Sequence, residues 1–153
     1  MKIPSQFLHN KAQPSPKYFN MGVGLSSYSL ILNHFPLTGK LIGANEYEGH
    51  YVFDLIYNNT TKVVPKIHST DTHGVNQINF CLLDFFGYQF APRYKNFSNR
   101  RFYSFSTPSE YKDIPLKPFR KINRDLIIQE WENIKKIILS LENKSSTQAI
   151  IVQ

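Results

Sequence analysis

Apolar and polar side chains alternate along Val23–Asn33, a pattern that predicts a β-strand with one buried face. The proline and glycine of Pro36–Lys40 favour a turn, and Leu41 and Ile42 are expected in a second, antiparallel strand. The preceding segment, Met1–Asn20, contains three prolines and no sustained periodicity, which predicts a loop. The N-terminal third therefore indicates a loop followed by a β-hairpin.

Helices and strands are then expected to alternate. Asn45 is a suitable N-cap for a helix with a broad apolar face. The β-rich segment Val63–Ile67 predicts a third strand that runs to about Asp71. The apolar stretch from Gly74 to Phe86 predicts a second helix, which the following glycine closes. This alternation is typical of an α/β fold.

Further along, Tyr88–Ala91 alternates again, and a short strand is expected at Arg101–Phe105. A long amphipathic helix is predicted from about Asn123. Its apolar residues recur at steps of three and four and share one face: Ile127, Trp131, Ile134, Ile138 and Leu141. We assign this stripe to packing, not to chemistry.

The composition fits a single folded domain. The chain has 153 residues, of which 41% are hydrophobic and 14% aromatic, so a disordered chain is disfavoured. No apolar run reaches the roughly 20 residues of a membrane span, and no signal peptide is recognisable. The single cysteine, Cys81, is expected to be a small buried hydrophobe. We therefore expect a reduced, cytoplasmic protein with no membrane partner.

The net charge of +7 is concentrated in one aromatic-rich segment, Arg93–Lys121. Cations can hold phosphates while aromatic rings stack on unpaired bases, so this segment predicts a nucleic-acid contact. The alternative is a solvated surface whose rings pack into the core. Its basic residues are Arg93, Lys95, Arg100, Arg101, Lys112, Lys117, Arg120 and Lys121, against the two acidic residues Glu110 and Asp113.

The segment His68–Gly74 carries the strongest candidate chemistry, because Asp71 lies between His68 and His73 at the expected end of a strand. One interpretation is that Asp71 caps the helix that follows. Another is a divalent-metal ligand, since α/β folds place ligands at the carboxyl ends of strands. Two histidines and one aspartate are also the residue types of a zinc or iron site. However, successive residues of a strand alternate faces, so His68 is expected to point away from Asp71. We therefore expect structural roles for both histidines.

Familiar enzyme signatures are absent from the sequence. It contains no P-loop, dinucleotide fingerprint, nucleophile elbow or paired-cysteine zinc motif. Several of the commonest enzyme classes are thereby excluded.

Several short segments, in one order, resemble the C-terminal catalytic region of Tn3-family transposases, the DDE enzymes of replicative bacterial transposons. The resemblance covers about Asn10 to Gln153. It rests on these segments: Ser15–Phe19, Ile42–Glu46, His50–Phe53, His68–Gly74, Phe86–Arg93, Lys117–Asn123 and Glu130-Trp131.

The resemblance implies an RNase H-like core in which three carboxylates hold two Mg²⁺ ions for phosphoryl transfer. Asp71 corresponds to the second of these acids and is thus the expected catalytic residue and metal ligand. The first acid would lie in the segment Met1–Phe7, where no Asp or Glu occurs, and the third acid would lie beyond Gln153. Asn20 stands where the family usually has glycine. With one acid of three, we expect at most weak Mg²⁺ binding.

The fold implied is an α/β, RNase H-like core that is incomplete, lacks its first strand and ends in an amphipathic helix. We divide this partial domain into an N-terminal loop (1–20), the core (21–92), a basic connection (93–121) and a helical part (122–153). Without the first strand we expect marginal stability, aggregation, or rescue by pairing of Lys2–His9 in its place.

The expected function is that of a transposase fragment whose ancestral role is DNA transposition and which is inactive alone. The expected partners are transposon ends, target DNA and a full-length transposase or a second copy. The alternatives are a non-enzymatic DNA-binding module, an inert pseudogene product and, more distantly, a mononuclear His/Asp metal enzyme. The residues expected to contact phosphate are Lys17, Arg93, Arg100, Arg101 and Arg120.

Overall fold

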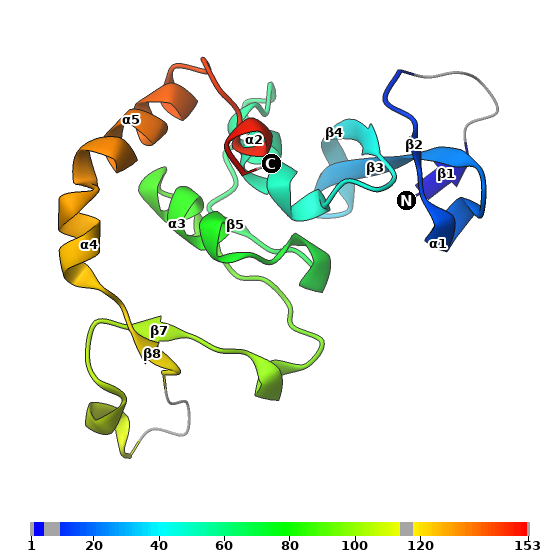
Figure 1. Ribbon diagram of the computed structural model, residues 1–153. Coiled ribbons are helices and arrows are strands. Elements are labelled where there is room, and N and C mark those ends of the chain that lie inside the picture. The colour runs from blue at the N-terminus through cyan, green and yellow to red at the C-terminus, as the bar shows by residue number, and fades with distance from the viewer. Residues whose placement is uncertain (1, 5–9, 114–117, 153) are drawn as a thin grey trace. The chain divides into compact units, whose positions relative to one another are not determined.

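The computed structural model describes residues 2–4, 10–113 and 118–152 (Figure 1). They divide into two compact units. Unit 1 comprises Met1–Arg93 and Thr147–Gln153, and unit 2 comprises Tyr94–Ser146. Both contain helices and strands, so the general α/β expectation agrees with the structure.

A long antiparallel hairpin, β3 (Val23–Leu32) and β4 (Phe35–Gly43), is the largest element of unit 1. Its two-residue turn is formed by Asn33 and His34, with φ of 46° and 73°. Positive φ at both central positions is the conformation that matches the twist of paired strands. The turn expected at Pro36–Lys40 was therefore wrong, because those residues pair with β3 and the chain reverses before them.

The N-terminal segment is structured, which corrects the expected loop over residues 1–20. Short strands β1 (Lys2–Pro4) and β2 (Gln13–Pro14) pair with β3. The helix α1 (Pro16–Phe19) follows, with proline in its first turn, where a missing N–H does no harm.

Strand β1 lies on the edge of β3 that β4 leaves open, because Leu25 pairs with Ile3 on one side and with Gly43 on the other. The pairing expected for Lys2–His9 is thus found at Lys2–Pro4. Residues 5–9 lie outside the described residues.

After the hairpin, the chain enters a 3₁₀ turn, η1 (Glu48–Tyr51), and then helix α2 (Val52–Tyr57). The expected N-cap at Asn45 was wrong, since the first helical turn begins three residues later. Every residue of Val52–Ile56 is buried, so this short helix has no solvent face. Ile42, Tyr51 and Ala149 form a core cluster onto which Tyr28 packs.

The next elements are β5 (Ile67–His68), η2 (Thr72–Gly74), α3 (Gln77–Phe85) and β6 (Gln89–Phe90). Strands β5 and β6 pair in parallel. The helix expected from Gly74 to Phe86 is confirmed in its main part and closes at Gly87, whose φ is 78°. The expected burial of Cys81 was wrong: this thiol is exposed, because the buried face of α3 is formed by Asn79, Leu82 and Leu83.

Helix α6 (Gln148–Val152) returns to unit 1 and is held by buried polar groups. Asp54 is only 4% exposed. Its carboxylate accepts hydrogen bonds from the backbone N–H of Gln148, at 2.7 Å, and from that of Ala149, at 3.2 Å. The Gln148 side chain in turn accepts the Phe53 N–H and donates to the Gly49 carbonyl and to Asn79. The first turn of α6 thus has its free amides satisfied.

Unit 2 contains a parallel pair, β7 (Tyr103–Ser104) and β8 (Arg120–Lys121), followed by helices α4 (Arg124–Gln129) and α5 (Trp131–Glu142). Two 3₁₀ turns, η3 (Phe97–Asn99) and η4 (Pro108–Tyr111), flank β7. The strand expected at Arg101–Phe105 is confirmed in its central residues. The expected continuous helix is instead two helices that meet at Glu130, which has φ −89° and ψ 7°.

Candidate functional site

Asp71 is positioned by the parallel pairing of β5 with β6. The hydrogen bonds of this pair continue beyond the strands, from the Ala91 N–H to the His68 carbonyl and from the Arg93 N–H to the Thr70 carbonyl, both at 2.8 Å. Asp71 follows directly after the last of these bonds. The predicted placement after a strand is confirmed, but the strand expected from Val63 to about Asp71 is reduced to Ile67–His68 and is not buried throughout, since Ile67 is 62% exposed while His68 is buried.

The Asp71 side chain caps η2, because its Oδ1 accepts the His73 N–H at 3.0 Å. The turn is tight: a Cβ at Gly74 would lie 2.7 Å from the Thr70 Cβ. The capping interpretation is confirmed, although the cap is that of a 3₁₀ turn and not of α3. Asp71 nevertheless remains exposed, so its carboxylate keeps access to solvent.

A groove of about 470 Å³ lies between β3 and β5, with Asp71 on its wall. The same groove is lined by Tyr28 and Glu48. Glu48 accepts a hydrogen bond from the Ser26 hydroxyl at 2.9 Å. Burial, followed by the charges of Glu48 and Asp71, raises the pKa of Tyr28 above its usual value. Two carboxylates therefore act on one phenol within this groove.

Sequence reasoning did not select Glu48 as a site residue. The position of Glu48 follows from the length of the hairpin. The nine residues of β4 bring the chain back beside Ser26 of β3, and Glu48 comes shortly after β4 ends. Without knowing where the hairpin turns, this proximity cannot be derived.

His68 also lines the groove, but it is buried, being 9% exposed. Burial lowers its pKa to about 4, so the imidazole is neutral at physiological pH. Its ring lies nearly parallel to that of Phe90, with 6.2 Å between centroids. The buried Nε2 has no hydrogen-bond partner within the described residues.

The described residues do not fit a two-metal centre. Among residues 2–4, 10–113 and 118–152, no three His, Cys, Asp or Glu side chains come together to hold an ion. His68 is buried and His73 is exposed, so the two do not converge with Asp71. Two Mg²⁺ ions in displacement geometry need more oxygen ligands than Asp71 and Glu48 supply. We therefore derive no catalytic step through metal ions in this chain.

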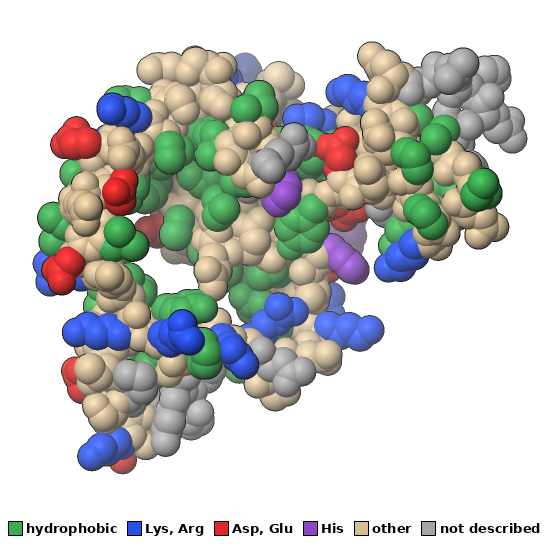
Figure 2. All heavy atoms as spheres, viewed as in Figure 1, with side chains coloured by type: hydrophobic (Ala, Val, Ile, Leu, Met, Phe, Trp, Pro, Cys, Tyr) green, Lys and Arg blue, Asp and Glu red, His purple; other side chains and the backbone are tan. Residues whose placement is uncertain are grey.

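The basic and aromatic residues of unit 2 converge around β7 and β8. The guanidinium carbon of Arg101 lies 4.2 Å from the centroid of the Phe119 ring, and that of Arg120 lies 5.1 Å from it. Arg100 is placed similarly over Tyr94, at 5.0 Å. Stacking on a ring holds a guanidinium in position while its N–H groups remain available to phosphate. Figure 2 shows Lys and Arg side chains gathered over the part of unit 2 that contains β7 and β8.

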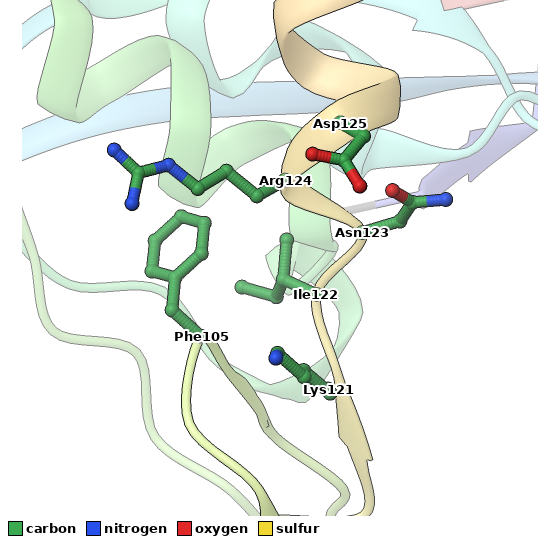
Figure 3. A pocket seen from close by; sticks show the side chains of 6 residues that line it. All are labelled: Phe105, Lys121, Ile122, Asn123, Arg124 and Asp125. Atoms are coloured by element: carbon green, nitrogen blue, oxygen red, sulfur yellow. The ribbon is translucent and has the colours of Figure 1, made fainter.

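An open hollow of about 480 Å³ adjoins these strands, and it is lined by the Phe105 ring, by the cations Lys121 and Arg124 and by the Asp125 carboxylate (Figure 3). The Phe105 ring, 59% exposed, lies beside Ile122, and the Arg124 side chain extends past the ring. Lys121 lines the same hollow. Sequence reasoning did not select Lys121, the last residue of the basic segment, or Arg124, three residues beyond it, as phosphate contacts.

The remaining predicted phosphate contacts lie in unit 1. Arg93 is exposed and adjoins the Asp71 loop, since its carbonyl accepts from the Thr72 hydroxyl at 3.3 Å. Lys17 is exposed on α1, with its Nζ 5.1 Å from the Tyr18 ring. The structure therefore groups Arg100, Arg101 and Arg120 within unit 2 and leaves Arg93 and Lys17 at separate places in unit 1.

Comparison with known proteins identifies the family. The Tn3 transposase DDE domain family matches residues 1–153, so the chain belongs to this family, as the resemblance of its motifs predicted. The chain is 27% identical over 140 residues to the transposase for transposon Tn4556 of Streptomyces fradiae, covering 91% of the chain. It is 24% identical over 153 residues to the transposase for transposon Tn1546 of Enterococcus faecium, covering 99% of the chain.

The match to relatives is partial on their side. The chain spans about 15% of the length of each of these two curated relatives. No solved structure matches the chain. Within the part that the structure describes, no helix is long and apolar enough to cross a membrane.

Proposed function

We propose that this chain is a DNA-contacting portion of a Tn3-type DDE transposase, with an incomplete RNase H-like core, and that it does not cleave DNA by itself. The observation that carries the proposal is Asp71, which stands at the end of β5 with an exposed carboxylate on the wall of the β3–β5 groove. This is the position that the family resemblance gives to a catalytic acid.

In a complete site, Asp71 would be one of the carboxylates that bind Mg²⁺, which supplies a Lewis acid for phosphoryl transfer. Here its Oδ1 is engaged by the His73 N–H, which leaves Oδ2 as the freer oxygen. The cap fixes the rotation of the carboxylate without burying it. The chain therefore orients one ligand of the proposed site.

DNA is the proposed substrate, and the residues that contact it lie chiefly in unit 2. Arg101 and Arg120 both lie over the Phe119 ring, so two guanidinium groups, each a fork of N–H donors, are held at one place. The exposed Phe105 ring offers a stacking surface for an unpaired base between Lys121 and Arg124. The arrangement suits a distorted or single-stranded segment at a transposon end.

A nicking and strand-transfer assay on transposon-end DNA tests the catalytic part. With Mg²⁺ or Mn²⁺ we expect no product from the purified chain, because one family acid and one additional carboxylate do not hold two ions. Product that disappears in an Asp71→Ala variant would contradict this.

Gel-shift titration across salt concentrations tests the DNA-binding part. We expect the affinity to fall steeply as the salt concentration rises, since released counterions drive phosphate contacts. The alternative of an inert chain predicts no saturable shift at low salt.

A further inference from the structure

Two fully buried amide side chains, Asn79 of α3 and Gln148 of α6, face each other inside unit 1. The Gln148 Nε2 donates to the Asn79 Oδ1 at 2.5 Å. The two residues are 69 positions apart in the sequence, so the fold and not a local turn brings them together. Buried amides of this kind need partners for their remaining polar atoms as well. We call Asn79 and Gln148 the amide pair.

The Asn79 side chain joins two turns that are distant in the sequence. Its Nδ2 donates to the Gly74 carbonyl at 2.8 Å and to the Gly49 carbonyl at 3.0 Å. Gly74 is the last residue of η2, and Gly49 belongs to η1. Because carbonyls only accept, the amino side of the amide must face them, and its oxygen is left for Gln148. One side chain therefore ties the two turns together.

The turn that Asn79 holds is the turn that follows Asp71. The Gly74 N–H donates to the Asp71 carbonyl at 3.2 Å, and the His73 N–H donates to the Asp71 Oδ1 at 3.0 Å. Gly74 is thus bonded to Asp71 through its N–H and to Asn79 through its carbonyl. Since η2 is only three residues long, a shift of Gly74 is passed on to His73 and to the Asp71 carboxylate that it holds.

The Gly49 carbonyl is the second point at which these side chains meet. It accepts from the Asn76 Nδ2 at 3.2 Å, from the Asn79 Nδ2 at 3.0 Å and from the Gln148 Nε2 at 3.1 Å. Glu48 directly precedes Gly49 and lines the same groove as Asp71. The same donors therefore fix the turns that carry both carboxylates.

Gln148 connects this arrangement to α6. Its Oε1 accepts the Phe53 N–H at 2.9 Å, and its own backbone N–H is bound by the Asp54 carboxylate at 2.7 Å. Both polar atoms of the Gln148 side chain are thus satisfied within unit 1. Along the chain, α6 follows unit 2. The segment that returns from unit 2 therefore supplies one half of the amide pair.

We propose that Asn79 and Gln148 are positioning residues for Asp71. The amide pair holds η2 in the conformation that presents the Asp71 carboxylate, and it does so only while α6 is docked on unit 1. Neither residue is among the described residues that line the groove, so both act through Gly74. The inference rests on the proposed function for the role of Asp71.

Amide hydrogen exchange measured by NMR on the purified chain, without DNA or metal, tests the proposal. Asn79→Leu and Gln148→Met keep a side chain of similar size but remove its donors and acceptor. We expect the amides of His73 and Gly74 to exchange about tenfold faster or more in both variants, because η2 opens locally. Amides of the β3–β4 hairpin should change by less than about twofold.

The His73 amide resonance reports the Asp71 carboxylate directly, since that carboxylate is its acceptor. Asp71→Ala gives the position of this resonance without the acceptor. We expect the resonance in Asn79→Leu and in Gln148→Met to move towards that position. A resonance that stays in place in both variants would overturn the proposal, because a loss of general stability alone leaves the folded state's hydrogen bond intact.

Leu83→Val is the matched control, because it trims a fully buried side chain of the same helix and keeps both amides. It should leave the ratio of His73 exchange to β4 exchange unchanged. If His73 and β4 amides accelerate equally in Asn79→Leu and Gln148→Met, the amide pair has a general structural role and the proposal is wrong. An effect of Asn79→Leu without one of Gln148→Met would overturn the dependence on α6.

Asp54→Ala provides a second route if Asn79→Leu fails to fold, which far-UV circular dichroism would show. It releases the first turn of α6 without altering either member of the amide pair. His73 exchange should again accelerate more than β4 exchange, and an unchanged ratio would contradict the proposal. These measurements contain no DNA, so a negative gel shift leaves them standing, and their failure leaves the proposed DNA contacts untouched.

Discussion

At the scale of single residues, Asp71 combines two interpretations that the sequence presented as alternatives. It caps a 3₁₀ turn through Oδ1 and lines the groove with the rest of its carboxylate. Spacing alone could not show this, because a cap and a ligand require the same residue at the same strand end. Its role as a metal ligand stays a prediction.

Asn20 stands where the resemblance to the family implies a glycine, and its backbone conformation suits that residue. It has φ 52° and ψ −109°, a conformation that side chains disfavour and glycine adopts easily. We expect Asn20→Gly to stabilise unit 1 by about 1 kcal/mol, measured by urea unfolding. Asn58→Gly is the matched control, since φ at Asn58 is −93° and glycine there brings only added freedom in the unfolded state. Equal effects of the two substitutions would refute the strain argument.

His68 should make stability depend on pH. Its pKa is about 4 in the folded chain against an ordinary 6.5, because burial disfavours the charged imidazole. As the pH falls, the unfolded chain takes up the proton first, so stability is fully present above about pH 6.5 and is lost towards pH 4. The expected loss is about 2–3 kcal/mol. Urea unfolding at several pH values measures it.

The matched variants for this prediction are His68→Phe and His73→Gln. Phe removes the titrating group at the buried position, so the pH dependence between 6.5 and 4 should be reduced. His73 is exposed, and its substitution should leave the dependence unchanged. A slope that persists unchanged in His68→Phe would assign the effect to other groups.

At the scale of elements, prediction succeeded where the local pattern carried the information. Helix α3 was recognisable from its apolar residues and from the glycine that closes it, and β3 from its alternation. The turn of the hairpin was misplaced, because Asn33 and His34 adopt positive φ without the usual glycine. The burial of Cys81 was misjudged because the groups that pack against α3 come from distant parts of the chain.

Helix α6 depends on a contact that no local pattern reveals. Only the fold brings Asp54 to the amides of Gln148 and Ala149, about 94 residues away in the sequence. We expect Asp54→Ala to destabilise unit 1 by about 2–3 kcal/mol, because two buried N–H groups lose their acceptor. Amide exchange in Gln148–Val152 should accelerate in parallel.

The control for Asp54→Ala is Asp84→Ala on α3, where the carboxylate is exposed. It should change stability by less than about 0.5 kcal/mol. If urea unfolding shows the same loss for both variants, the buried carboxylate is not what holds α6.

At the scale of the whole molecule, the family was recognisable because several segments recur in a fixed order, which does not depend on knowing the fold. The completeness of the site could be judged only in part. The sequence contains no acidic residue before Glu46, but the approach of Glu48 to the groove follows from the path of the hairpin. The RNase H-like assignment stays a proposal, which the antiparallel hairpin of β3 and β4 and the parallel pairing of β5 with β6 support.

The charge of the molecule provides the last prediction. If DNA binding reflects only the net charge of +7, any one cation is equivalent to any other. The stacked arginines argue otherwise, since the Phe119 ring holds the guanidinium groups of both Arg101 and Arg120 in position. We expect Arg101→Gln to weaken binding and to reduce the slope of log affinity against log salt by about 0.9. Lys136→Gln, exposed on α5, removes the same charge and should leave the slope nearly unchanged. Identical slopes for the two variants would show that binding follows overall charge and not the Phe119 cluster.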